Sequence, residues 1–225
     1  DNFTISGETI DYGPCAFLDE YHPGKVFSSI DQAGRYAFGN QPSIASWNLA
    51  SLAGCLIAFI DKDSDKANKF ATEVLENFSI ETNQRILDLM CQKIGLAGNN
   101  QKNQSLLKRL LKIMMDNQSD YTITFRGISE VLRDNLDEFY GQFNDREEID
   151  VWLIDWQNQL KEEHKDIASL AEQLDSINPA FIPRNHILQE VIEGAYENDF
   201  TKFYEMIEII KNPFVANKET SSYMT

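Results

Sequence analysis

The chain has 225 residues and a formal net charge of −16, with 42% hydrophobic, 11% aromatic and 25% charged residues. This length is enough to bury a hydrophobic core, and the composition is that of a folded globular protein rather than a disordered chain. The negative charge argues against binding to phosphate backbones or anionic lipid headgroups, because both need clustered Lys and Arg. We therefore expect neither nucleic acid nor a membrane as a partner.

Cysteine usage points to a reducing compartment, and hydropathy bears on whether a segment spans a membrane. Cys15, Cys55 and Cys91 are far apart and odd in number, which argues against a disulfide framework or a zinc site. The longest apolar run, residues 49–60, is shorter than the roughly 18 residues of a membrane span. Cysteine usage therefore predicts a reducing cytosol. The start of the chain has no signal-peptide pattern, but it opens on Asp-Asn without an initiator Met, so the alternative of an excised piece with its targeting segment elsewhere stays open.

The composition changes sharply near residue 43. Residues 1–43 are rich in Gly, Pro, Ser and aromatic residues and have no helical period, whereas residues 44–214 are dominated by helical periodicity. Residues 215–225 are predicted to form a frayed tail. The sequence thus predicts a mainly α protein that begins with a short β element.

Apolar residues recur at helical spacing in a series of segments after Pro42. The first segment is predicted to be a core helix, and Trp47, Trp152 and Trp156 are predicted to lie in the core. Residues 136–143 either extend a neighbouring helix or form a short turn. The predicted helices cover residues 43–60, 63–78, 80–94, 105–115, 121–132, a segment capped by Asp145 that reaches Leu160, and residues 167–177, 184–196 and 200–210.

Polar and apolar residues alternate on either side of Ser6-Gly7, which predicts a tight β-hairpin. With these two residues as the loop, Asn2 faces Asp11 across the strands. An amide oxygen and a carboxylate placed opposite each other, at about 5 Å between Cβ atoms, suit a hard cation that also binds phosphate oxygens. Kinases hold such metals with an Asn and the Asp of a D-F-G tripeptide, and residues 11–13 fit that pattern. From the residues alone, a structural hairpin without metal remains the more common alternative.

Two longer strings make the pattern specific. The first extends from Asp1 to about Ala53 and includes DNFTISGETIDYGPCAFLD, VFSSIDQAGRYAFGNQP and WNLA; the second is NPAFIPRNH at residues 178–186. Both strings closely resemble the selenoprotein O (YdiU) family. One departure is Ser51, which stands where the family pattern has Arg.

The resemblance implies a protein-kinase-like C-terminal lobe with a helical extension. It also implies transfer of AMP from ATP to Ser, Thr or Tyr hydroxyls of proteins, with Mg²⁺ or Mn²⁺ as the cofactor. In the family's pattern Asp1 matches the catalytic base, which removes the proton of the attacking hydroxyl, and Asn2 and Asp11 match the metal ligands. Arg35 follows the hairpin closely and is the candidate for binding ATP phosphates, ahead of Arg184. For both arginines, a structural salt bridge is the alternative.

The family's Gly-rich loop, strand Lys and partnering Glu would all precede Asp1. We therefore expect this C-terminal fragment to need the missing N-terminal lobe of the same protein and to be inactive alone, because positioning and charge neutralisation supply most of such catalysis. The resemblance implies the cytoplasm for a bacterial protein and the mitochondrion for a eukaryotic one. Two alternatives remain: an ordinary kinase-like phosphotransferase, and a non-catalytic helical interaction module.

Overall fold

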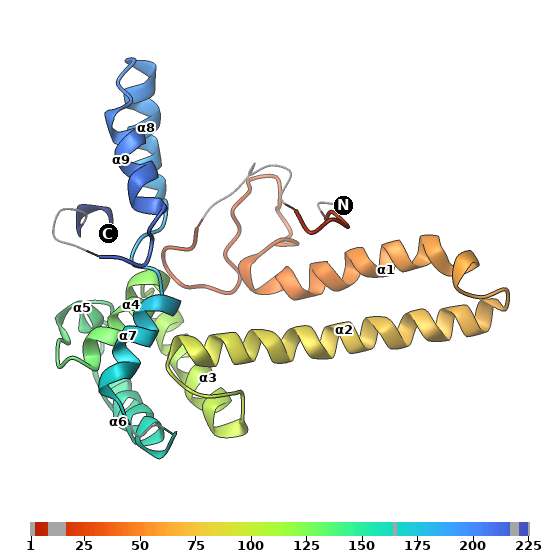
Figure 1. The fold of residues 1–225 in the computed structure, drawn as a ribbon, viewed down its shortest axis with the longest axis horizontal. Helices are drawn as coiled ribbons and strands as arrows, with labels where there is room; N and C mark the ends of the chain where they lie inside the picture. The colour runs from red at the N-terminus through yellow and green to blue at the C-terminus, as the bar shows by residue number, and fades with distance from the viewer. Residues whose placement is uncertain (1–2, 9–16, 164–165, 217–220, 225) are drawn as a thin grey trace. The chain divides into compact units, whose positions relative to one another are not determined.

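The computed structural model describes residues 3–8, 17–163, 166–216 and 221–224, and these residues form a mainly helical protein (Figure 1). Within these ranges no residue lies in a β-strand, and one isolated antiparallel bridge joins Glu20 to Asp120. The helices are η1 (Phe38–Asn40), α1 (Gln41–Ile60), α2 (Ser64–Lys93), α3 (Gln101–Asp116), α4 (Tyr121–Val131), α5 (Asp137–Tyr140), α6 (Glu147–Glu163), α7 (Ala168–Ile177), α8 (Asn185–Tyr196), α9 (Thr201–Ile210) and η2 (Ser221–Tyr223).

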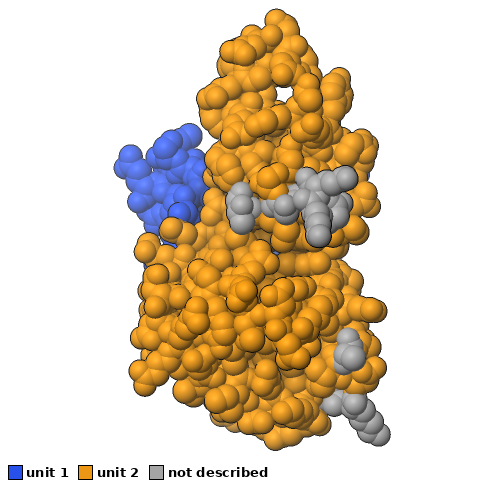
Figure 2. Space-filling view, turned by 90° about the vertical axis from the view of Figure 1, so that its left-hand side faces the viewer, with its two compact units in different colours: residues 1–15, 22–87 blue, residues 16–21, 88–225 orange. Residues whose placement is uncertain are grey.

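The chain divides into two compact units, coloured separately in Figure 2. Unit 1 comprises residues 1–15 and 22–87, and unit 2 comprises residues 16–21 and 88–225. Helix α2 contributes to both units, because the boundary falls between Leu87 and Asp88. The units are described one at a time below.

Unit 1 is built on the long helices α1 and α2, which run side by side in opposite directions (Figure 1). Pro42 lies in the first turn of α1, where its missing N–H leaves no hydrogen bond unmade. At the start of α2, the Asp63 carboxylate accepts a hydrogen bond of 3.0 Å from the backbone N–H of Asp65. The hydroxyls of Ser46 and Ser79 are 3.2 Å apart and join the two helices.

The core of unit 2 is built from helices α3 to α7, with α4 against α5 and α7 and with α3 against α6. At its centre the indole rings of Trp152 and Trp156 stack with centroids 5.5 Å apart. Both rings are fully buried, and their Nε1–H groups donate 2.8 Å hydrogen bonds to the carbonyls of Leu106 and Ile94. The prediction that these two tryptophans lie in the core is confirmed.

Several helix ends in unit 2 form by local side-chain chemistry. Asn100 caps α3 and Asp120 caps α4 by accepting hydrogen bonds from backbone N–H groups in the first turn. The Asp145 carboxylate accepts from Glu147 N at the start of α6, as predicted. Gly95 ends α2 with φ +75, a conformation that favours glycine, and the bond from Leu96 N to the Cys91 carbonyl closes the cap.

Helices α8 and α9 pack against each other around a small separate cluster. Its buried members are Ile187, Val191 and Met206, and Leu188 and Tyr223 pack against them. The break between the two helices falls at residues 197–200, in agreement with the predicted segments.

Three predictions about unit 1 are wrong. The segment predicted to be a core helix is α1, but only Ile44 and Asn48 are buried along it. Trp47, predicted to lie in the core, is 48% exposed. The two helices predicted over residues 63–94 are the single helix α2, because no Gly or Pro interrupts it.

The predicted N-terminal β-hairpin is not seen among the described residues. Residues 3–8 contain a turn in which Gly7 N donates to the Thr4 carbonyl at 3.3 Å, so the turn is centred on Ile5 and Ser6 rather than on Ser6-Gly7. The cause is the positive φ of Gly7, +71, which is typical of a glycine that follows a turn of this kind. The Thr4 hydroxyl also donates to the Glu8 carbonyl at 2.8 Å. The remaining residues of the predicted strands lie outside the described ranges.

One helical stretch among the described residues, Phe38–Ile60, is long and apolar enough to cross a membrane by length and composition. The sequence prediction missed it because it counted only residues 49–60. Uncharged polar residues such as Ser46 and Asn48 lower the hydropathy of a helix far less than charges do. Composition alone therefore does not support the expectation that a membrane is excluded.

Candidate functional site

The predicted base and metal ligands, Asp1, Asn2 and Asp11, lie outside the described residues. Their expected roles therefore remain predictions, and a carboxylate with an amide oxygen is a donor set that suits Mg²⁺ or Mn²⁺. Among the described residues, no group of three or more His, Cys, Asp and Glu side chains is arranged to hold a metal ion.

Arg35, the predicted phosphate-binding residue, is held in a tight turn of unit 1. The Asp31 carboxylate accepts hydrogen bonds from the backbone N–H of Arg35 at 2.8 Å and of Tyr36 at 2.7 Å. The amide of Asn40, just before α1, donates to the Arg35 carbonyl at 2.6 Å. Two side chains therefore fix the backbone of Arg35 from both sides of the turn.

The guanidinium of Arg35 is held by aromatic rings. Its Cζ atom lies 4.2 Å from the centre of the Trp47 ring and 5.7 Å from that of Tyr36. Its Nε–H also donates to the Tyr36 hydroxyl at 3.4 Å. Stacking on indole orients an arginine without neutralising its charge.

Arg35 makes no ion pair with a described carboxylate; the ion pairs of arginine in the described part of the chain belong to Arg109, Arg126, Arg133 and Arg184. A pre-oriented guanidinium with its charge uncompensated can bind a phosphate through two parallel hydrogen bonds. Geometry and charge thus favour the functional interpretation of Arg35 over a structural salt bridge.

Arg184 has the opposite environment, in unit 2. Its guanidinium is 4% exposed; Nη1 donates to Asp19 Oδ1 at 2.8 Å and also to Asp120, while Nη2 donates to the Met224 carbonyl at 2.9 Å. Burial lowers the pKa of Arg184, but the hydrogen bonds and charges of the two aspartates outweigh it, so the pKa is raised. With both terminal nitrogens engaged, Arg184 is a structural brace, which was the alternative for this residue.

The brace fixes residues 19–21, which lie within the first family-like string of the sequence. Tyr21 N donates to the Ser119 carbonyl at 2.9 Å, and Tyr121 N donates to the Asp19 carbonyl at 2.7 Å. Arg184 thereby joins residues 19–21, the capped start of α4 and the start of α8, all within unit 2.

The second string, residues 178–186, is also structural in the part that precedes α8. The Asn178 amide donates to the Lys93 carbonyl at 2.8 Å, and the N–H groups of Ala180 and Phe181 both donate to the Pro213 carbonyl. Arg126 supports the same region by donating to the Asn178 carbonyl at 3.0 Å. This string therefore contributes to the packing of unit 2.

Sequence reasoning selected Arg35 as a candidate and did not predict the residues that position it. Asp31 lies four residues before Arg35, and Asp is a residue type that is common in turns because its side chain bonds nearby backbone N–H groups. For Trp47 the sequence pattern was misleading. Helical spacing of apolar residues predicts burial, whereas the Trp47 ring is partly exposed and stacks on the Arg35 guanidinium.

Comparison with known proteins gives a consistent result over the whole chain. The sequence model of the family described as Protein adenylyltransferase SelO matches residues 1–211. Proteins named Protein nucleotidyltransferase YdiU from Agrobacterium fabrum and Maridesulfovibrio salexigens are each 44% identical over 225 residues, which is 100% of this chain and 46% of each relative. The protein of the same name from Bacillus thuringiensis is 40% identical over 224 residues, or 99% of this chain and 45% of the relative. The chain thus spans about half the length of the curated relatives it matches.

Proposed function

This chain belongs to the SelO family of protein adenylyltransferases, and we propose that it is the catalytic-loop and helical part of an enzyme that transfers AMP from ATP to Ser, Thr or Tyr hydroxyls of proteins. The match of the family over residues 1–211 carries the proposal. The names of the relatives support nucleotidyl transfer rather than phosphoryl transfer. We further propose that the helical part belongs to a kinase-like C-terminal lobe.

The proposed roles follow from the resemblance and from the setting of Arg35. Asp1 accepts the proton of the substrate hydroxyl as the oxygen attacks the α-phosphorus of ATP; the bond to the bridging oxygen breaks and pyrophosphate leaves. Asn2 and Asp11 hold Mg²⁺ or Mn²⁺, which when bound neutralises charge on the phosphates. Arg35 binds a phosphate oxygen, supported by its stacking on Trp47 and its lack of a described carboxylate partner.

The test uses a chimera in which this chain replaces the matched portion of the Agrobacterium fabrum relative. We expect the chimera to transfer label to protein from ATP labelled at the α-phosphate and not from ATP labelled at the γ-phosphate. Asp11→Ala should abolish the transfer, and this chain alone should give none. Label from the γ-phosphate would instead identify a kinase. No label from either ATP, in a chimera that is folded, would support the non-catalytic module.

Arg35 has a separate test in the same chimera. Arg35→Lys keeps the charge but loses the planar fork, so we expect KM for ATP to rise about tenfold, the equivalent of one good charged hydrogen bond. The matched control is Arg109→Lys, which changes an exposed pair with Asp155 in unit 2. An unchanged KM in the Arg35 variant would remove Arg35 from the site and leave the family assignment intact.

A further inference from the structure

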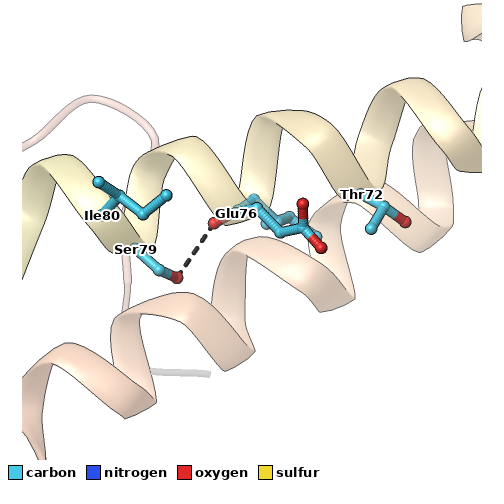
Figure 3. A pocket seen from close by; sticks show the side chains of 5 residues that line it. Thr72, Glu76, Ser79 and Ile80 are labelled. Atoms are coloured by element: carbon cyan, nitrogen blue, oxygen red, sulfur yellow. Dashed lines mark hydrogen bonds between the residues drawn. The ribbon is translucent and has the colours of Figure 1, made fainter.

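A shallow groove of ≈ 460 Å³ lies on α2 of unit 1 (Figure 3). The Ser79 hydroxyl, which is part of its lining, donates to the Leu75 carbonyl at 3.0 Å and lies 3.2 Å from the hydroxyl of Ser46. This polar group is therefore already paired, and the groove belongs to the contact between α1 and α2. The lining residues are Thr72, Leu75, Glu76, Ser79 and Ile80.

Residues 221–224 of unit 2, which we call the 221–224 strap, contact the helix pair α8 and α9. The Tyr223 side chain packs against the small apolar cluster of this pair. Its hydroxyl donates to Glu205 Oε2 at 2.8 Å, and burial together with this hydrogen bond raises the pKa of Tyr223 to about 12. The ring and the hydroxyl thus anchor the strap by two different interactions.

The residue after this anchor reaches the buried guanidinium of Arg184. The Met224 carbonyl accepts a hydrogen bond of 2.9 Å from Arg184 Nη2. The Arg184 side chain is 4% exposed, and its Nε atom is buried without a hydrogen-bond partner among the described residues. Because an unpaired N–H is costly inside a protein, a guanidinium that already has one depends strongly on the acceptors it does contact. The Met224 carbonyl is one of those acceptors.

The same guanidinium holds residues 19–21 through Asp19. Arg184 Nη1 donates to Asp19 Oδ1 at 2.8 Å, and the Asp19 side chain is 43% exposed, so this link can open to water. Two backbone hydrogen bonds to the start of α4 complete the attachment of residues 19–21. In the sequence this segment begins eight residues after Asp11, the proposed metal ligand.

We propose that Tyr223 is a positioning residue that acts through Arg184. It anchors the strap, the strap keeps the Met224 carbonyl on the guanidinium, and the guanidinium keeps residues 19–21 in place. The coupling itself follows from contacts within unit 2. Its consequence for catalysis rests on the proposed function, because a loosened segment 19–21 weakens the placement of Asp11 without removing any metal ligand.

Amide hydrogen exchange in this chain tests the coupling without any activity. Tyr223→Ala removes the anchor, and we expect the Tyr21 N–H to exchange about tenfold faster because local opening of residues 19–21 becomes easier. The N–H of Ile128, a fully buried residue of α4, should keep its rate, and NMR reads both groups. The matched control is Tyr196→Ala, at a tyrosine of α8 that is 86% exposed, and it should change neither rate.

A double variant tests whether the effect passes through Arg184. In Arg184→Met the strap has no guanidinium to hold, so adding Tyr223→Ala should accelerate exchange at Tyr21 by less than about a further twofold. Tyr223→Phe keeps the ring on α8 and α9 and removes only the bond to Glu205, so we expect an acceleration of about threefold. Tyr223→Phe also decides the matter if Tyr223→Ala does not fold.

The chimera described above tests the consequence for catalysis. Tyr223→Ala should raise the Mg²⁺ concentration that gives half-maximal transfer about fivefold, and kcat at saturating Mg²⁺ should change by less than about twofold. Tyr223→Phe should restore most of the parent value, because the ring still anchors the strap. A chimera that transfers no label counts against the proposed function, and the exchange experiment then decides the role of Tyr223 by itself.

Three results overturn the proposal. Unchanged exchange at Tyr21 in Tyr223→Ala means that the strap does not hold residues 19–21. Equal acceleration at Tyr21 and Ile128 means that Tyr223 supports the stability of unit 2 as a whole and positions nothing in particular. Faster exchange at Tyr21 with an unchanged Mg²⁺ dependence, in a chimera that is active, means that the placement of residues 19–21 does not affect the metal.

Discussion

Unit 1 and unit 2 use similar helices in opposite ways. In unit 2, α6 buries Trp152, Trp156 and Leu160 almost completely, and both indole N–H groups find backbone carbonyls. In unit 1, α1 is the more uniformly apolar helix but buries only Ile44 and Asn48. Apolar sequence thus marks surface that needs a partner, and it does not say whether the partner lies in the same chain.

The first prediction tests the packed side of this contrast. Trp156→Ala removes a fully buried ring that stacks on Trp152, and it leaves the Ile94 carbonyl without its indole donor. We expect unit 2 to lose roughly 3–5 kcal/mol of unfolding free energy. Urea denaturation followed by far-UV circular dichroism measures the loss. A change below about 1 kcal/mol would mean that unit 2 is not the tightly packed unit of the pair.

The contrast also explains which parts of the fold were predictable. Two helix starts in unit 2 were found because their signals are local: Asp120 and Asp145 accept hydrogen bonds from backbone N–H groups at the starts of α4 and α6. The start of α3 was missed, because the helix begins at Gln101 and the prediction began it at residue 105. The burial of α1 was predicted wrongly because periodicity identifies an apolar surface and not its partner. The turn of residues 3–8 was displaced by one residue because the conformation of Gly7 selects the loop, and alternation of side chains does not.

The second prediction concerns the brace of unit 2. Arg184→Met leaves Asp120 and Asp19 without the guanidinium that they share, and Arg184 is nearly fully buried. Removing one partner of a buried pair should cost roughly 3 kcal/mol. The same urea experiment applies, and Arg109→Met, at an exposed pair, is the matched control, with an expected cost below about 1 kcal/mol. Equal costs for the two variants would show that the Arg184 cluster is no more than a surface pair.

For the candidate site, the sequence singled out Arg35 but did not predict its surroundings. Its position in a long family-like string was visible, whereas the stacking on Trp47 depends on a contact across 12 residues that no pattern encodes. Arg184 lies in an equally specific string and proved structural, because its partners Asp19 and Asp120 are distant in sequence and meet only in the fold. A specific motif therefore did not distinguish a candidate ligand contact from a brace.

The third prediction is a pH effect in unit 2. Lys93 lies over the rings of Tyr121 and Phe125, with Nζ 5.7 Å and 5.0 Å from their centres, and burial lowers its pKa from 10.5 to about 8. Between those values the unfolded chain binds more protons than the folded one, so this group makes stability rise as pH increases from about 8 to 10.5. At pH 7 the buried ammonium is unfavourable, and its attraction to the rings offsets only part of the cost.

Lys93→Met should therefore stabilise unit 2 at pH 7 by about 1–2 kcal/mol and lose that advantage by about pH 10. Comparing the variant with the parent at each pH cancels the opposite trend from Cys91, whose pKa is raised by burial, so that its contribution falls as pH increases from 9 to about 11. A stabilisation that stays constant from pH 7 to 10 would show that Lys93 is not titrating in this range.

The last prediction makes one substitution at two places, and the smallest effect of all is expected at the exposed place in unit 1. Leu160→Ala on α6 of unit 2 removes a side chain that is 1% exposed and should cost roughly 2–5 kcal/mol. Leu56→Ala on α1 of unit 1, where the side chain is 43% exposed, should change stability by no more than about 0.5 kcal/mol. Both replace leucine by alanine within a helix, so propensity differs little and burial is the variable. A large cost at Leu56 in this chain alone would mean that α1 is already covered in solution, and the difference between the two units would then not be one of burial.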